Sequence, residues 1–461
     1  MSTESVLADL LSGVGLAQAL LGRLQLRGRE IVLPSSFHVE RAAAASIAAS
    51  GLVATLVHQA RGGGEQGVSV DYRHAAAAFH SEHFLKLDGV WMPREPGDIG
   101  GLYPMLGGGW VRVHANFPHH RDGVLRLLGC APTKAAVAEV LSRWDALAFE
   151  DAAVAAGLVV TAYRSFAEWD AHPQAEAIPT LPLVRIERTG DAPPADWGRA
   201  ETPLGGLRVL DLTRVIAGPV GTRTLAAHGA EVLTITGPGL PSYGIEDLGR
   251  GKRQAQLDLR REDGRAHLTE LLRGADVFVQ GYRPGTIAGR GFSPEFAASL
   301  RPGIVTASLS AYGTAGPWAG RRGFDSLLQT ATGFNDAEAE AFGQTTPRAL
   351  PVQALDHATG YLLAFGILTA LHRRLTEGGS WHVSVSLART GYWLRELGRR
   401  TEIAVAEQSR DSVMDLLEAS DSGFGRMEAV SHPAILAATP ARLVRLSVPL
   451  GNDAAAWVSE D

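Results

Sequence analysis

The sequence predicts an α/β protein built on a doubly wound parallel sheet. The clearest signal lies in residues 206–259, where an apolar run at 207–212 is followed by an Ala-rich stretch that closes at Gly229 and by a second apolar run at 232–235. This order of apolar runs around a stretch of helical composition is typical of a strand–helix–strand unit. Further alternations follow along the chain, and strands that alternate with helices form parallel sheets covered on both faces.

The elements of this region carry recognisable end signals. Pro219, in Ala217-Gly218-Pro219, suits the first turn of a helix, where its missing N–H is not needed, and Gly229 suits the residue just beyond the last turn. Between turn residues, the pattern then predicts further elements in the order helix 266–273, strand 276–280, helix 294–300 and strand 304–309.

A unit of helix, glycine turn and strand occurs twice. Residues 356–375 carry Ala, Leu, Ile and Phe at helical spacing and precede adjacent glycines and the strand-like Val-Ser-Val of 383–385. Near the N-terminus, residues 43–58 precede three glycines and another Val-Ser-Val at 68–70. We therefore predict an internal repeat.

The region between the two copies differs in character. It begins rich in aromatic and turn residues and continues with helical patterns around 134–144 and 149–156, and the segment 190–201 has the Pro, Asp and Ala content of a linker. The predicted organisation is a partial repeat of the large domain at 1–75, a small domain at 76–195, a linker at 196–202, a large domain at 203–395, and a C-terminal segment at 396–461 that packs back on the large domain.

Composition excludes several classes of protein. The 461 residues are 45% hydrophobic and 20% charged, as expected of a globular chain with more than one domain. A single cysteine, Cys130, excludes a disulfide framework, and the net charge of −6 with scattered arginines offers no footprint for nucleic acid. The first residues carry acids where a signal peptide needs bases, and no uninterrupted apolar run is long enough to span a bilayer. We expect a cytoplasmic protein with no nucleic-acid or membrane partner.

The loops of the predicted sheet do not match nucleotide motifs. The segment 214–221 lacks the GxGxxG spacing, and Thr236 stands where an acid would hold the ribose of NAD, so a dinucleotide site is disfavoured. Lys252 and Arg253 follow two glycines and are read either as phosphate contacts or as part of a solvated loop.

Metal and hydrolase chemistry are also disfavoured. His114, His119 and His120 cluster near Asp122, but their spacing matches no ligand pattern, and we interpret them as surface or packing histidines with no bound metal. No GxSxG sequence is present, and the apolar context of Cys130 is more typical of a buried thiol than of a nucleophile.

Asp356 stands directly before an apolar helix. An acid at this place occupies the N-cap or the first turn, where backbone amides and the helix dipole favour its ionised form. The pattern alone favours a capping role and leaves a reactive carboxylate as the alternative.

Several short motifs occur in a characteristic order between residues 206 and 385. They are 206–212, Ala217-Gly218-Pro219, 229–232, Lys252-Arg253 with 257–259, 275–277 with 281–285, Gly313 with Gly316-Pro317, and Leu355-Asp356 with the helix behind it. In this order the stretch resembles the class III coenzyme A transferases, the CaiB/BaiF family that includes formyl-CoA transferases and α-methylacyl-CoA racemases. The resemblance implies a Rossmann-like doubly wound sheet with a smaller α/β domain.

The resemblance also implies an activity. The aspartate at the position of Asp356 attacks an acyl-CoA thioester to form a mixed anhydride, becomes an aspartyl-CoA thioester, and passes CoA to a second carboxylic acid. CoA is then a substrate rather than a permanently bound cofactor. The racemases place a histidine where this chain has Phe324, and a phenyl ring cannot exchange a proton, so transfer is preferred. The alternatives are a racemase or another CoA-thioester isomerase, and a catalytically silent CoA-binding or scaffold protein.

The chain departs from the usual family order, in which the large domain comes first. Residues 76–195 and 425–451 resemble the family's small domain and C-terminal segment, so the order looks permuted or partly duplicated. In the N-terminal copy, alignment by the Val-Ser-Val strand puts Arg41 opposite Asp356, whereas alignment by Leu33-Pro34 puts Val39 there. Glu40 lies between these two positions, but no aspartate does, so we interpret that copy as structural.

CoA is expected at the carboxyl ends of the strands. The predicted contacts are Ala217, Gly218 and Pro219 with the cations Lys252, Arg253 and Arg283, which are expected in loops beside those strand ends. Family members form interlocked homodimers, so the resemblance also implies a homodimer.

Overall fold

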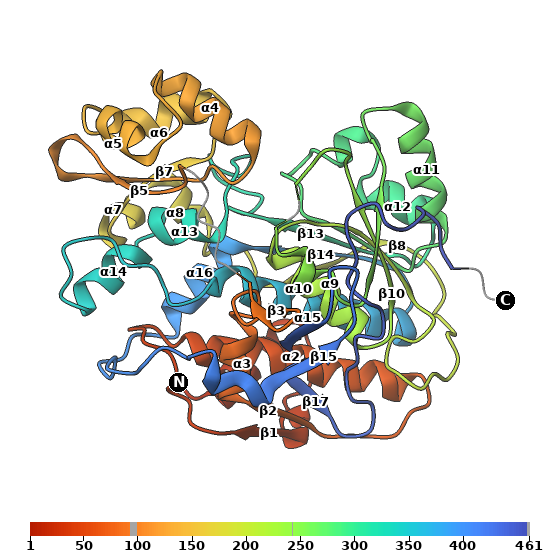
Figure 1. Ribbon diagram of the computed structural model, residues 1–461. Helices are drawn as coiled ribbons and strands as arrows, with labels where there is room; N and C mark the ends of the chain where they lie inside the picture. Colours follow the sequence, from red (N-terminus) through yellow and green to blue (C-terminus); the bar gives the residue numbers. More distant parts are fainter. Residues whose placement is uncertain (93–98, 242, 459–461) are drawn as a thin grey trace.

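A seven-stranded sheet lies at the centre of the computed structural model, which describes residues 1–92, 99–241 and 243–458, and it confirms the predicted α/β class (Figure 1). The strand order is β11-β10-β9-β12-β13-β14-β8. The first six strands run parallel and β8 closes one edge antiparallel. In chain order β9 to β14 are arranged 3-2-1-4-5-6, the doubly wound order. Their bounds are β8 Arg185–Gly190, β9 Arg208–Leu212, β10 Glu231–Thr236, β11 Lys252–Gln256, β12 Val277–Gln280, β13 Val305–Ser310 and β14 Ser380–Ser386.

Both faces of this sheet are buried, as its apolar strands predict. Val209 packs into the core cluster that holds α9 (Ala217–Ala227) and α15 (Ala354–Thr376). The next residue, Leu210, packs into a second cluster with α11 (Glu262–Arg273) and α12 (Pro294–Leu300). Successive side chains of a strand point to opposite faces, so the two helix pairs cover opposite sides of the sheet. The end signals of α9 are confirmed, since Pro219 lies in its first turn and Gly229 has a positive φ of 102° just beyond its last.

The N-terminal unit repeats part of the large sheet. It contains α2 (Val39–Ala60) and a three-stranded sheet, β1-β2-β17, with β1 at Leu24–Arg27, β2 at Val68–Asp71 and β17 at Ala434–Leu436. β2 pairs parallel with β1 and antiparallel with β17, which is the pattern that β14 makes with β13 and β8. The repeat predicted from the two Val-Ser-Val strands is therefore present as half of a second sheet with its helix.

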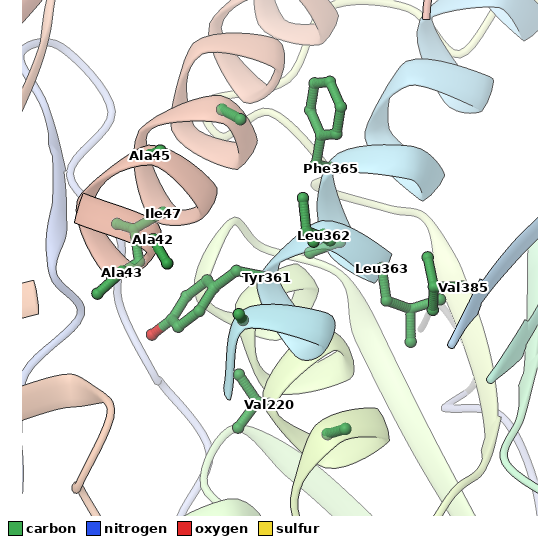
Figure 2. Packing of buried hydrophobic residues seen from close by; sticks show 14 of the residues in the cluster. Ala42, Ala43, Ala45, Ile47, Val220, Tyr361, Leu362, Leu363, Phe365 and Val385 are labelled. Atoms are coloured by element: carbon green, nitrogen blue, oxygen red, sulfur yellow. The ribbon is translucent and has the colours of Figure 1, made fainter. Parts of the chain in front are cut away.

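The two helices of the repeat share one core. Figure 2 shows small side chains of α2, among them Ala42 and Ala45, beside Tyr361 and Leu362 of α15. By length and composition both helices could cross a membrane, but 89% of the apolar window of α2 and all of that of α15 are buried inside the protein. They are core helices, and alanines on α2 leave room for the larger side chains of α15.

The segment predicted as the small domain has a core of its own. Its sheet joins β5 (Gly101–Pro104), β6 (Trp110–Val113) and β7 (Val160–Ala162), packed with α4 (Pro118–Leu128), α5 (Lys134–Leu141) and α6 (Ala146–Ala155). The helix predicted from residue 149 begins three residues earlier, because the side chain of Asp145 accepts hydrogen bonds from Leu147 N and Ala148 N. β8 falls within the predicted bounds of the small domain, 76–195, but it pairs with β14 at the edge of the large sheet.

The C-terminal segment contacts both the N-terminal unit and the large sheet (Figure 1). β17 completes the N-terminal sheet, Asp453 accepts a hydrogen bond from Gln254 N, and the Trp457 indole donates to Leu271 O.

The remaining α-helices and strands of the described residues are α1 Thr3–Gly13, α3 Tyr72–Ala78, β3 Lys86–Leu87, β4 Val90–Trp91, α7 Phe166–Asp170, α8 Pro173–Ala177, α10 Ile245–Leu248, α13 Asp325–Ala331, α14 Phe334–Ala341, α16 Leu387–Glu396, β15 Leu417–Ser420 and β16 Met427–Val430.

A buried histidine beside α9 makes stability depend on pH. His228 is 1% exposed, neither of its ring nitrogens has a partner among the described residues, and burial lowers its pKa to about 4. The unfolded chain takes up this proton below about pH 6.5. The stability that neutral His228 confers is therefore present above pH 6.5 and lost as the pH falls towards 4, by about 3 kcal/mol.

This dependence can be measured by urea unfolding between pH 7 and pH 4. The slope of unfolding free energy against pH should be shallower in His228→Leu than in the wild type. His267→Leu changes an exposed histidine on α11 and should leave the slope unchanged. Equal slopes in wild type and His228→Leu would contradict the prediction.

Candidate active site

A cavity of about 320 Å³ lies at the carboxyl ends of β9, β12 and β13. Open α/β sheets bind ligands at this edge, where the loops of neighbouring parallel strands converge. Its walls come from the segments after these strands, from residues 321–324, from Asp356 and Leu387, and from the small domain. The small domain contributes Phe117, His119 and His120, so the cavity lies between two parts of the chain that are far apart in sequence.

Asp356 occupies the first turn of α15, as predicted, but it does not cap the helix. The N-cap residue is Gln353, and the carboxylate of Asp356 makes no hydrogen bond with any residue that the structure describes. Asp325, at the start of α13, takes the capping role: its Oδ2 accepts from Leu355 N at 2.8 Å and from Asp356 N at 2.9 Å. The capping interpretation of Asp356 is therefore wrong, and its carboxylate, only 7% exposed, is left to face the cavity.

The surroundings of Asp356 favour its neutral form. Burial raises the pKa of this carboxyl well above its usual range, and the charges of Asp325 and Glu82 raise it further. Burial likewise raises the pKa of Asp325 to about 6, although the amide of Asp356 and the side chain of Gln329 donate to its carboxylate. The Glu82 carboxylate accepts a hydrogen bond from His357 Nε2 at 3.1 Å, next to Asp356 along the helix. Asp356 is thus a desolvated carboxyl whose ionised form is strongly basic.

The prediction that Lys252 and Arg253 lie in a loop is wrong. Both lie on β11, whose polar sequence Lys-Arg-Gln-Ala-Gln hid the strand from pattern analysis. Lys252 is 2% exposed, and its ammonium donates to Pro219 O, Thr222 Oγ1 and Asp211 Oδ2, which uses all three of its protons. It lines a smaller neighbouring cavity of about 40 Å³.

Arg253 is also paired within the protein. Its guanidinium lies 3.4 Å from Glu231 Oε1 and 3.8 Å from Asp453 Oδ1. Neither Lys252 nor Arg253 lines the cavity that contains Asp356. Their charged groups contact other residues of the protein and hold β11 and the C-terminal segment in place.

The other predicted contacts fall in different places. Ala217 and Arg283 line the cavity that contains Asp356. Gly218 lies inside the first turn of α9, where an added Cβ would come within 2.4 Å of Thr213, so its place is set by close packing. Pro219 lies in the same turn and lines the smaller cavity.

Sequence reasoning missed three side chains of the cavity wall. Arg214 and Arg322 line the cavity and, like Arg283, form no ion pair within residues 1–92, 99–241 and 243–458. His120, interpreted as a packing or surface residue, is 4% exposed and belongs to the same wall. Arg214 lies two residues after the first strand of the strand–helix–strand unit, which is a signal that could have indicated it. Nothing in the local sequence could have placed His120 there.

Other residues considered from the sequence lie elsewhere or differ in role. Phe324 lines the cavity and stacks on His114, with ring centroids 3.9 Å apart. Burial raises the pKa of the Cys130 thiol, which packs beside the core of the small domain. The described part of the chain has no group of three or more His, Cys, Asp or Glu arranged to hold a metal ion.

The N-terminal copy presents a different side chain at the matching helical position. Asp356 is the third residue of α15, and Arg41 is the third residue of α2. Alignment by the Val-Ser-Val strand, which paired these two residues, therefore agrees with the structure. The guanidinium of Arg41 lies 2.6 Å from Glu30 Oε1.

Residues 204–408, which contain the sheet strands β9 to β14 and Asp356, match the family model of CoA-transferase family III. This segment belongs to that family. A curated acetyl-coenzyme A transferase, nodX of Hypoxylon pulicicidum, is 36% identical over 207 residues, covering 43% of this chain and 35% of the relative. The acetyl-CoA:oxalate CoA-transferase of Acetobacter aceti is 34% identical, covering 40% of this chain and 51% of the relative. The chain thus spans about a third to a half of the length of these two relatives.

Two further proteins are similar to this chain. An acyl-CoA transferase of Gibberella moniliformis is 27% identical over 419 residues, covering 80% of this chain and 73% of the relative. Among solved structures, a crystal structure of the Mycobacterium tuberculosis protein Rv3272 is 32% identical, with a TM-score of 0.39, and covers 42% of this chain and 58% of that one.

Proposed function

We propose that the chain is an acyl-CoA:carboxylate CoA transferase whose nucleophile is Asp356. The observation that carries the proposal is the free carboxylate of Asp356 in the cavity, because Asp325 rather than Asp356 supplies the helix cap. The family match of residues 204–408 and the CoA-transferase names of the relatives support the class of reaction.

The reaction begins with attack by Asp356 Oδ on the carbonyl carbon of an acyl-CoA. The carbon–sulfur bond breaks, CoA leaves as thiolate, and a mixed anhydride remains on Asp356. The thiolate then attacks Cγ of Asp356, which releases the first acid and leaves an aspartyl-CoA thioester. A second carboxylate attacks this thioester to form a new anhydride, and the thiolate then attacks the carbonyl of the new acid and frees Asp356. The desolvated, basic carboxylate of Asp356 favours the first attack once its proton has been lost.

CoA is proposed to enter along the loops that follow β9 and β12. Ala217 at the start of α9 and Arg283 on the β12 loop line this approach, and the exposed guanidinium of Arg283 suits a phosphate. Lys252 and Arg253 are left out because their charges are already paired. Phe324 carries no exchangeable proton at the cavity wall, so transfer is proposed rather than racemisation.

Trapping of the intermediate tests the proposal. The wild-type protein should be incubated with a panel of acyl-CoAs, quenched with hydroxylamine and digested for mass spectrometry. A hydroxamate on the peptide that contains Asp356, together with CoA passed to an added acid, is the expected result. Transfer with modification at another residue would contradict the nucleophile assignment. CoA binding with neither transfer nor modification would favour a silent CoA-binding protein.

A further inference from the structure

The small domain holds one wall of the active-site cavity. This wall, residues 321–324, lies between β13 and α13. Arg321 Nη2 donates a hydrogen bond to Glu150 Oε1 of α6 at 2.7 Å. Arg322 Nη1 donates to Gly157 O, just beyond the same helix. Both arginines of the wall are therefore attached to α6.

Glu150 is a buried carboxylate at the centre of these contacts. It is 2% exposed, and it accepts hydrogen bonds from Arg164, Arg321, Thr161 Oγ1 and Ala162 N. Burial opposes its charge, but the hydrogen bonds and charges of Arg164 and Arg321 outweigh burial and lower its pKa below the usual value. Glu150 therefore stays ionised, and an ionised carboxylate between two guanidinium groups restrains both of them.

The wall continues directly into α13, whose first residue is Asp325. Asp325 Oδ2 accepts from Leu355 N and Asp356 N, so the position of α13 sets the position of the proposed nucleophile. The small domain contacts α13 at a second point, where Arg112 Nε of β6 donates to Thr330 Oγ1 at 3.2 Å. A shift of the small domain against the sheet would therefore move the carboxylate of Asp356.

The segment that carries the wall needs such an anchor because its backbone is unusually free. Between β13 and α13 it contains four glycines, which are Gly313, Gly316, Gly320 and Gly323. Glycine loses more conformational freedom on folding than any other residue, so side-chain contacts must offset that loss. Gln174 of α8 holds the first part of the segment, for example through Trp318 N at 2.6 Å. Glu150 holds the last part through Arg321, whose guanidinium carbon also lies 3.9 Å from the ring centre of Trp318.

We propose that Glu150 is a positioning residue for CoA transfer. Through Arg321 it fixes the wall and the start of α13, and in this way it places the carboxylate of Asp356 for attack. The inference rests on the proposed function, in which Asp356 is the nucleophile. Glu150 itself does not line the cavity, so its effect on the reaction passes through the residues that it holds.

Glu150→Gln tests the proposal, because the amide keeps an oxygen acceptor and removes the charge that holds both arginines. The kinetic assay uses the acyl-CoA and the acid of the trapping panel that react fastest. We expect kcat to fall about tenfold and KM for the acyl-CoA to change much less, because a displaced nucleophile affects the transition state more than it affects binding.

Hydrogen exchange gives a second measurement, which needs no substrate. In Glu150→Gln the backbone amides of residues 321–328 and 353–358 should exchange faster than in the wild type, as followed by mass spectrometry of peptides. Glu139→Gln is the matched control. It removes the carboxylate of an exposed pair in the same domain, Glu139 with Arg143 at 2.8 Å, and should change neither kcat nor exchange.

Arg321→Gln separates the route through Arg321 from a general loss of stability, because it leaves Glu150 paired with Arg164. If Glu150 acts through Arg321, adding Glu150→Gln to Arg321→Gln should lower kcat by about twofold at most, against about tenfold in the wild-type background. Equal losses in the two backgrounds, or an undiminished kcat in folded Glu150→Gln, would overturn the proposal.

Arg321→Gln also keeps the proposal testable if Glu150→Gln does not fold. Exchange at residues 353–358 should then rise in Arg321→Gln alone, and unchanged exchange there would count against the positioning role. If exchange rises as expected but the wild-type protein transfers CoA from no member of the panel, the proposed function fails. The placement of Asp356 by the small domain would still stand in that case.

Discussion

Asp356→Asn should abolish CoA transfer and leave the fold intact. An amide cannot form the mixed anhydride, and removal of a nucleophile lowers kcat by about 10⁴-fold or more. The variant should unfold at no lower a urea concentration than the wild type, because the cap of α15 comes from Asp325 and because a neutral amide removes the repulsion between two buried acids.

The control for this variant is Asp263→Asn, which changes an exposed acid in the first turn of α11. It should transfer CoA at the wild-type rate, measured by liquid chromatography of the CoA thioesters. A folded Asp356→Asn protein with undiminished transfer would show that Asp356 is not the nucleophile.

Asp325→Ala should lower both stability and activity. The substitution leaves Leu355 N and Asp356 N without their acceptor inside the protein and removes a partner of Gln329. Loss of a cap together with unsatisfied buried groups costs about 3 kcal/mol, measurable by urea unfolding. Displacement of the first turn of α15 moves the carboxylate of Asp356, so we expect kcat to fall by about 10²-fold.

Asp325→Asn separates these two effects. It retains an oxygen for the two amides, so it should lose less stability than Asp325→Ala. It also removes a negative charge beside Asp356, which lowers the pKa of that residue. Because transfer requires ionised Asp356, kcat/KM rises with pH as its proton is lost, and this rise should move to lower pH in Asp325→Asn. An unchanged profile would show that Asp325 does not influence the charge of Asp356.

Local patterns in the sequence determined much of the fold. The apolar runs that form β9, β10, β12 and β13 are bounded by turn residues, and α15 has a continuous helical pattern. Each of these elements can therefore be predicted from its own segment of sequence. The repeated Val-Ser-Val strands likewise predicted the N-terminal copy. The order of the motifs along the chain indicated the family, and the family resemblance indicated Asp356 as a candidate nucleophile. The order of motifs depends on the sequence alone and not on how the chain folds.

What depends on distant segments was decided only by the tertiary structure. β11 was missed because Lys252 can be buried in a strand only when Asp211 and Thr222, from other elements, accept its protons. Asp356 was misread as a cap because the cap comes from Asp325, 31 residues earlier in the chain. His120 reaches the cavity because α4 of the small domain packs over the carboxyl ends of the sheet. Such contacts join residues that share no local pattern, and burial then sets their charge and their chemistry.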